Sequence, residues 1–157
     1  MKIVILSDTH GNFNGFFNVV NRNDDADLFL HLGDGYNEYL KIREIFKDKT
    51  IYMVKGNCDF FDLPQQKILD VEGKKLFACH GDKFNVKMGL DEYIKFAKSK
   101  NFNIIVYGHT HIRFIHKEED LCIINPGSLT LPRKFGPSYC VLYVERNLVE
   151  PKIIEYL

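Results

Sequence analysis

The 157-residue sequence predicts an α/β fold in which two β-sheets pack face to face with helices on the outside. Two observations predict it. In the first half of the chain, short apolar runs rich in β-branched residues alternate with segments of helical periodicity, a pattern typical of parallel strands joined by crossover helices. In the second half, strand-like runs come in pairs separated by short polar turns, a pattern typical of antiparallel hairpins.

The first half predicts three strands and two helices in alternating order. Residues 2–6, 27–32 and 50–55 are apolar runs that each lead into a polar, glycine-containing turn, as buried strands do. Between them, residues 12–21 and 36–46 place large apolar side chains three or four positions apart, which indicates amphipathic helices.

The second half predicts three hairpins, one helix and one further buried strand. Hairpins are expected over residues 67–81, 112–125 and 138–157, where two apolar runs flank a polar turn. Residues 90–101 have helical spacing, and residues 103–107 form a short β-branched run. No linker, repeat or low-complexity segment interrupts the pattern, so the whole chain is expected to form a single domain.

The composition is that of an ordinary globular protein, with 45% hydrophobic and 27% charged residues. Lys+Arg and Asp+Glu both count 21, so a net charge of zero argues against nucleic acid as a partner. No apolar run reaches the ~18 residues that a membrane helix needs, and the apolar N-terminal run lacks the cleavage site of a signal peptide. We therefore expect no membrane contact and a cytoplasmic location.

The cysteines and two of the histidines receive structural interpretations. Free thiols in a reducing compartment are expected rather than a disulfide framework or a zinc–thiolate site, because no Cys-x-x-Cys pair occurs. The four cysteines are Cys58, Cys79, Cys122 and Cys140. His31 lies inside an apolar run, so we expect it to pack in the interior or to support a ligand. His116 leads into an acidic turn and is expected on the surface.

Side chains able to bind metal follow the ends of the predicted strands. The turns read SDTHGN, GD, GNCD, CHGD and GHTH, and NPGS follows further along the chain. In α/β sheets the carboxyl ends of strands form the ligand crevice, and glycine lets the backbone turn tightly there. The side chains expected to converge on one rim are Asp8, His10, Asp34, Asn57, His80, His109 and His111.

This set of imidazole, carboxylate and amide groups predicts the kind of metal. It suits first-row ions such as Mn²⁺, Fe, Co²⁺, Ni²⁺ or Zn²⁺. Seven ligands are too many for one tetrahedral zinc and match two ions that share a carboxylate. Each motif alone has a structural alternative: Asp and Gly are common in turns, Asp8 and Thr9 can cap a helix, and both GHTH histidines can lie on the surface. The ordered set therefore predicts a dinuclear site.

These ordered motifs resemble those of the calcineurin-like metallophosphoesterases, from Asp8 to about Arg133. They are most similar to the small single-domain phosphodiesterase branch, which also includes the retromer scaffold subunit. The resemblance implies a four-layer αββα sandwich of two mixed β-sheets flanked by helices, the metallo-dependent phosphatase fold.

The resemblance also implies how two divalent ions per chain are held, with Mn²⁺ favoured over Ni²⁺, Zn²⁺, Co²⁺ or Fe. The implied ligands are Asp8, His10 and His111 for one ion, Asn57, His80 and His109 for the other, and Asp34 as the bridge. The implied reaction is phosphoester hydrolysis by a metal-activated hydroxide. Asp34, Asn57 and His80 would act in it through the metals and the phosphate.

The GNCD turn departs from the GNHE or GNHD of larger family members, in which the histidine protonates the leaving group. Cys58 stands in that place, and a thiol is a poor hydrogen-bond donor, so neither Cys58 nor Asp59 is assigned as the general acid. This favours small phosphodiesters as substrates. A phosphomonoesterase and a non-catalytic scaffold like the retromer subunit, which has lost ligand histidines, are the alternatives.

Two further residues are expected to contact substrate. Asn12 lies just after His10, where its amide would donate to a phosphate oxygen, and Arg133 follows the NPGS turn, where its guanidinium would meet an anion. A solvated basic turn is the structural alternative for Arg133. Strands and aromatic residues near the C-terminus suggest a homodimer or higher homo-oligomer.

Overall fold

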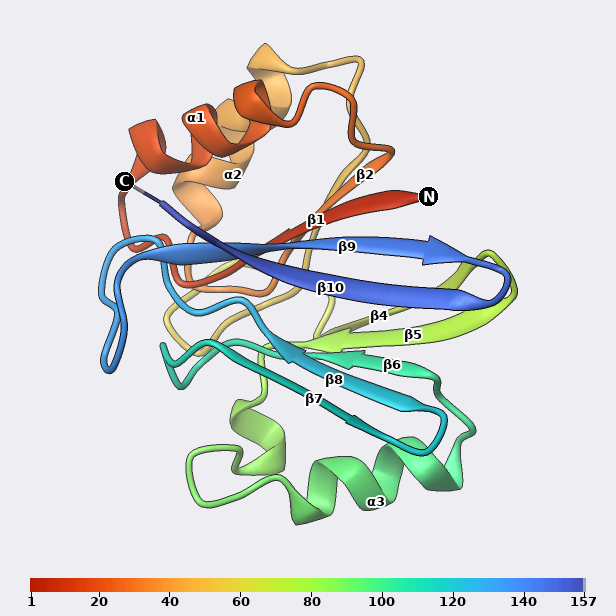
Figure 1. The fold of residues 1–157 in the computed structure, drawn as a ribbon. Coiled ribbons are helices and arrows are strands. Elements are labelled where there is room, and N and C mark those ends of the chain that lie inside the picture. The colour runs from red at the N-terminus through yellow and green to blue at the C-terminus, as the bar shows by residue number, and fades with distance from the viewer. Residues whose placement is uncertain (157) are drawn as a thin grey trace.

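In a computed structural model that describes residues 1–156, two five-stranded β-sheets pack against each other between outer helices (Figure 1). The first sheet contains β1 (Lys2–Leu6), β2 (Leu28–His31), β3 (Ile51–Met53), β9 (Ser138–Glu145) and β10 (Leu148–Glu155). The second contains β4 (Gln66–Val71), β5 (Lys74–Cys79), β6 (Ile104–Val106), β7 (Phe114–Glu118) and β8 (Leu121–Asn125). The helices are α1 (Phe13–Arg22), α2 (Tyr36–Ile45) and α3 (Asp91–Ser99), with a short 3₁₀ helix over Asp82–Phe84. The expected four-layer αββα sandwich is confirmed.

Both sheets are mixed. The first has the order β10-β9-β1-β2-β3, in which β1, β2 and β3 are parallel and β9 runs antiparallel to β1. The second has the order β4-β5-β6-β8-β7, in which β5, β6 and β8 are parallel. All three expected hairpins form, and each places one antiparallel strand at a sheet edge. The hairpin expected over 138–157 was drawn to Leu157, which lies outside the described residues.

The central strand β1 is apolar throughout because both of its faces are buried. Successive side chains of a strand point to opposite faces, so Ile3 and Ile5 enter the core between the sheets. Val4 and Leu6 point the other way and pack against the apolar faces of α1 and α2. A third cluster lies between the second sheet and α3, where Tyr93 packs on the sheet. Two sheets and two helical layers thus share three apolar cores.

Helix α1 begins at Phe13 because Asn12 caps it. Asn12 Oδ1 accepts a hydrogen bond from the Gly15 N–H at 2.8 Å, which satisfies one of the unpaired donors of the first turn. Phe16 and Val19 then fall on the buried face of the helix. The turn that ends β1 is thereby tied to the start of a rigid element, which fixes where its polar side chains lie.

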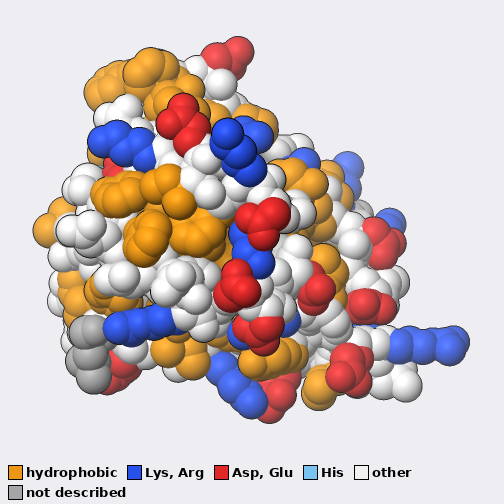
Figure 2. Space-filling model, turned by 90° about the horizontal axis from the view of Figure 1, so that it is seen from above, with side chains coloured by type: hydrophobic (Ala, Val, Ile, Leu, Met, Phe, Trp, Pro, Cys, Tyr) orange, Lys and Arg blue, Asp and Glu red, His pale blue; other side chains and the backbone are white. Residues whose placement is uncertain are grey.

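The outer surface over α1 and α2 has no extended region of a single charge sign. Figure 2 shows acidic and basic side chains interspersed with hydrophobic patches on this face. On α2, Leu40 and Ile45 are among the exposed apolar residues. In the described part of the chain, no helix has the length and apolar character required to cross a bilayer.

Candidate metal centre

Loops at the carboxyl ends of β1, β2, β3, β5 and β6 meet at one end of the sandwich and bring the seven expected ligands together. Parallel strands within a sheet end at the same edge, and face-to-face packing brings the two edges into contact. Three of the seven, Asp8, Asp34 and His80, are buried. The side chains form two groups joined by one carboxylate.

The first group consists of Asp8, His10 and His111. Asp8 Oδ1 lies 3.1 Å from His111 Nε2 and 3.8 Å from His10 Nε2. The two Nε2 atoms lie 3.4 Å apart. One carboxylate oxygen and two imidazole nitrogens therefore surround a single point.

The second group consists of Asn57, His80 and His109. His80 Nε2 lies 2.9 Å from Asn57 Oδ1 and 3.1 Å from His109 Nδ1. Asp34 stands between the two groups, because its Oδ2 is 3.5 Å from His80 Nε2 and 3.8 Å from His10 Nε2. Its other oxygen accepts a hydrogen bond of 2.8 Å from the Cys58 backbone N–H, so the carboxylate is held in this orientation.

Backbone carbonyls fix two of the imidazoles in the orientation that metal binding requires. His80 Nδ1 lies 2.6 Å from the Leu32 carbonyl oxygen, and His111 Nδ1 lies 2.8 Å from that of Leu131. A carbonyl oxygen only accepts hydrogen bonds, so Nδ1 of each ring carries a proton, and in the neutral ring Nε2 then presents its lone pair to the cluster. This is the arrangement commonly found around histidine ligands.

One buried oxygen lacks a partner. Asp8 Oδ2 accepts hydrogen bonds from Ser7 Oγ and from the His109 N–H, at 2.6 and 3.1 Å. Over residues 1–156, Asp8 Oδ1 is the single buried side-chain nitrogen or oxygen without an assigned hydrogen bond, and His111 Nε2 lies 3.1 Å from it. Burial raises the pKa of Asp8, but His111, His80 and Ser7 together lower it below its ordinary value. A buried carboxylate oxygen that lacks a hydrogen-bond partner and lies close to imidazole nitrogens fits a cation.

Left-handed backbone conformations concentrate at these residues. Non-glycine residues rarely have a positive φ, because Cβ then crowds the following carbonyl oxygen. Five of the seven candidate ligands have one: Asp8 (54°), His10 (40°), Asp34 (60°), His109 (65°) and His111 (58°). Strain of this kind persists only where surrounding structure enforces it, and it clusters at functional sites.

Asp59 holds the β2 and β3 loops together. Its Oδ2 accepts hydrogen bonds of 2.8 Å from both the Asp34 N–H and the Gly56 N–H. Its Oδ1 accepts bonds of 3.1 Å from the N–H groups of Gly35 and Tyr36, at the start of α2. The carboxylate is buried and turned toward the backbone, so its contacts give it a positioning role that the GNCD motif alone did not reveal.

A second buried carboxylate, Glu38, holds the β1 loop. Glu38 Oε1 accepts hydrogen bonds from the Gly11 N–H at 2.6 Å and from Thr9 Oγ1 at 2.9 Å. His31 is fully buried, accepts from the Gly33 N–H at Nδ1, and has its Nε2 3.0 Å from Thr9 Oγ1. Burial lowers the pKa of His31 to about 4, so its ring is neutral. Sequence reasoning expected His31 to be packed or to support a ligand, but it missed Glu38, which looked like one more helix residue.

The NPGS turn supports the first group of ligands from behind. Ser128 Oγ donates a hydrogen bond of 2.8 Å to the Asp8 carbonyl, and Thr130 Oγ1 donates one of 2.7 Å to that of Thr9. Asn125 Nδ2 donates to the Gly108 carbonyl at 2.9 Å. The motif therefore contributes no ligand and instead fixes the two loops that carry the first group.

The remaining expected residues lie around this centre. Cys58 is exposed as a residue. The pKa of its thiol is raised, first by partial desolvation and second by the nearby Asp34 carboxylate. Asn12 uses its amide within the fold, as the cap of α1 and as a donor to Leu129 at 3.4 Å. Arg133 is exposed, and its backbone N–H donates to the His111 carbonyl at 3.2 Å.

The substrate contacts expected of Asn12 and Arg133 stay predictions. His116 is on the surface, and the other three cysteines are buried free thiols.

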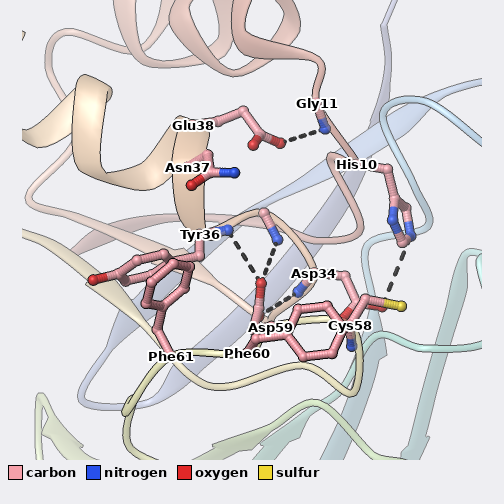
Figure 3. A pocket seen from close by; sticks show the side chains of 11 residues that line it. His10, Gly11, Asp34, Tyr36, Asn37, Glu38, Cys58, Asp59, Phe60 and Phe61 are labelled. Atoms are coloured by element: carbon pink, nitrogen blue, oxygen red, sulfur yellow. Dashed lines mark hydrogen bonds and ion pairs between the residues drawn. The ribbon is translucent and has the colours of Figure 1, made fainter.

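An open cavity of about 240 Å³ adjoins the metal-binding groups (Figure 3). His10, Asp34 and Cys58 lie at one end of it. At the other end are aromatic side chains, Tyr36 and Phe61 among them. No sequence motif predicted this cavity, because the residues that line it come from separate segments, the start of α2 and the loop after β3.

The sequence matches the Calcineurin-like phosphoesterase superfamily domain over residues 1–147. The chain belongs to the calcineurin-like phosphoesterase superfamily. A relative from Methanocaldococcus jannaschii, named probable metallophosphoesterase MJ0623, is 33% identical over 98% of this chain and 81% of its own length. Phosphodiesterase YfcE of Escherichia coli K12 is 26% identical over 88% of this chain and 84% of its own. This calcineurin-like chain is therefore related to small phosphoesterases along nearly its whole length.

Solved structures share the fold of this family member. A Streptococcus pneumoniae protein described as a predicted phosphoesterase superposes with a TM-score of 0.84, at 24% identity and over 98% of this chain and 88% of that one. Wild-type Vps29 of Entamoeba histolytica, complexed with Zn²⁺, gives a TM-score of 0.76 at 17% identity over 98% of both chains. At these identities the likeness establishes the architecture alone.

Proposed function

We propose that this calcineurin-like phosphoesterase is a single-domain, dinuclear metal-dependent phosphodiesterase that hydrolyses small phosphodiesters. The observation that carries the proposal is the position of Asp34. Its Oδ2 lies 3.5 Å from His80 Nε2 in one ligand group and 3.8 Å from His10 Nε2 in the other. Asp8, His10 and His111 would hold one ion, and Asn57, His80 and His109 the other. The unpartnered Asp8 Oδ1 supports a cation at the first position.

Two divalent ions, with Mn²⁺ favoured, would supply an activated water and neutralise charge on the phosphoryl oxygens. The chain's own groups prepare the site for this chemistry. Asp34 keeps an orientation fixed by the Cys58 N–H, and the Leu32 carbonyl holds the His80 ring with Nε2 turned toward the other ligands. Asn57, beside His80, presents its amide oxygen at the exposed edge, where the phosphate would arrive.

A diester is favoured over a monoester for two reasons. One relative is named a phosphodiesterase, and the GNCD turn offers a thiol where larger members carry the histidine that protonates the leaving group. The Cys58 thiol has a raised pKa and is exposed, so it is protonated at neutral pH but donates weakly. Diesters with good leaving groups need no strong acid and would be hydrolysed best.

Two alternatives remain distinct in their chemistry. A phosphomonoesterase would use the same ligands but would prefer a dianionic substrate. A non-catalytic interaction scaffold like the retromer subunit would need no complete ligand set. This chain presents all seven side chains at one rim, which favours an enzyme. We place the protein in the cytoplasm, and a homodimer or higher homo-oligomer stays a prediction.

Metal content and turnover test the proposal together. We would purify the protein without chelator, count bound ions, and compare bis(p-nitrophenyl) phosphate with p-nitrophenyl phosphate, with and without added Mn²⁺ or Ni²⁺. We expect about two ions per chain and faster turnover of the diester than of the monoester. Asp34→Ala should lose both the ions and the turnover. Asp62→Ala, which removes an exposed carboxylate, should keep both. Faster monoester turnover would overturn the substrate class, and absence of both metal and turnover would favour the scaffold.

A further inference from the structure

The cavity beside the ligand groups has an aromatic wall that the proposed chemistry does not use. The rings of Tyr36 and Phe61 stack with centroids 4.3 Å apart and planes inclined by 26° (Figure 3). Phe60 also lines the cavity and is 92% exposed, and Phe61 is 50% exposed. Single exposed apolar residues are common, but here two consecutive exposed phenylalanines, of which Phe61 stacks on Tyr36, line the same cavity.

The charges around the cavity select an uncharged occupant. None of the eleven residues that line it is a lysine or an arginine. Two of its three carboxylates already bind the protein: Glu38 holds Gly11 and Thr9, and Asp59 holds four backbone N–H groups. Asp34 belongs to the ligand groups. Away from the metal ions proposed at its His10–Asp34 end, an anionic group therefore finds no lysine or arginine in this cavity, whereas a neutral ring finds aromatic faces.

The size and position of the cavity indicate which part of a substrate it would take. At about 240 Å³ it is smaller than the roughly 300–1,000 Å³ of sites for drug-sized ligands, so it accommodates about one ring system. His10 and Asp34 line the cavity and belong to the ligand set, and Cys58 lies beside them. A substituent on a phosphate held at the metal centre would enter the cavity directly.

We propose that the Tyr36–Phe60–Phe61 wall binds a planar, uncharged aromatic substituent of the phosphodiester and so determines which diesters are preferred. The inference rests on the proposed function, because it places the phosphate at the metal centre. An aryl group and a nucleobase share this chemistry. The exposed amide of Asn37, also in the lining, offers a donor and an acceptor that only a nucleobase would use.

The test compares inhibitors that carry a single substituent. The metal-loaded enzyme would hydrolyse bis(p-nitrophenyl) phosphate while phenyl phosphate, methyl phosphate or thymidine 5′-phosphate competes. We expect phenyl phosphate to inhibit about tenfold more tightly than methyl phosphate, the scale of an aromatic contact. The double variant Phe60→Ala/Phe61→Ala should abolish that ratio while leaving inhibition by methyl phosphate unchanged. Met88→Ala is the matched control, because Met88 is equally exposed, at 91%, and lies outside the cavity lining.

Each outcome of this inhibition assay supports or contradicts the aromatic site. Equal inhibition by phenyl and methyl phosphate, or a ratio that survives the double variant, would overturn the aromatic site while leaving a working phosphodiesterase. Tighter binding of thymidine 5′-phosphate than of phenyl phosphate would assign a nucleobase, and weaker binding would assign a simple aryl group. A metal-loaded protein that hydrolyses no diester would overturn the proposed function and this inference with it.

Discussion

Replacing Asp59 with asparagine should destabilise the protein severely, although the two side chains have nearly the same shape. The Asp59 carboxylate accepts four backbone N–H groups from Asp34, Gly35, Tyr36 and Gly56. The amide oxygen of asparagine can accept two of them, and its NH₂ group would face the other two donors. Two charge-assisted bonds of about 1.5–3 kcal/mol each are therefore lost, so the free energy of unfolding should fall by about 3–6 kcal/mol.

Urea unfolding of the chelated protein measures this effect without a contribution from bound metal. The matched control is Asp62→Asn, an exposed carboxylate three residues away, which should change the free energy of unfolding by less than about 0.5 kcal/mol. Metal content should fall in Asp59→Asn as well, because the Asp34 N–H is one of the four donors. If both variants unfolded at the same urea concentration, the four contacts would not hold the loops as described.

Four further predictions follow from single features. A Cβ at Gly56 would overlap Asp34 Oδ1, so Gly56→Ala should lose at least tenfold in metal affinity by titration calorimetry, and unchanged affinity would contradict the geometry. Burial lowers the pKa of His31 to about 4, so between pH 6.5 and 4 the unfolded chain binds a proton that the folded chain does not. Unfolding free energy should therefore fall by about 3 kcal/mol across this window, and His31→Gln should lose that part of the pH slope in urea titrations. Cys58→Ala should keep full metal and more than about half of the turnover of an activated diester, and a complete loss of turnover would make the thiol the missing acid. Mn²⁺ in large excess should raise the melting temperature by several degrees in wild type but not in Asp34→Ala, as scanning calorimetry would show.

The local elements of this fold were predictable from the sequence. The first strand was expected at 2–6 and is found at Lys2–Leu6, because an unbroken β-branched run buried on both faces has few alternatives. The strand expected at 27–32 shortens to Leu28–His31, since its ends belong to loops. Nothing in the sequence indicated that β9 returns to pair with β1, because such pairing depends on packing between distant segments.

The candidate ligands were predictable for a different reason. Each follows an apolar run that ends in a glycine-containing turn, and the strand-end rule alone gathers them. The groups that hold them were not predictable, because Glu38 is identified only by its contacts with Thr9 and Gly11, 29 and 27 positions away. The aromatic cavity wall was not predictable for the same reason, since it depends on Tyr36 stacking on Phe61, 25 positions away, and on Phe60 lining the same cavity.

The left-handed backbone at five of the candidate ligands implies a trade-off between stability and function. Each such residue carries roughly 1–2 kcal/mol of strain that a glycine would not. A chain selected for stability alone would have unstrained residues at these positions. At His10 and His109 the fold therefore gives up stability to hold the imidazoles in their orientation. The end of the sandwich that carries the chemistry is therefore also a place where substitution by glycine would relieve strain at five positions.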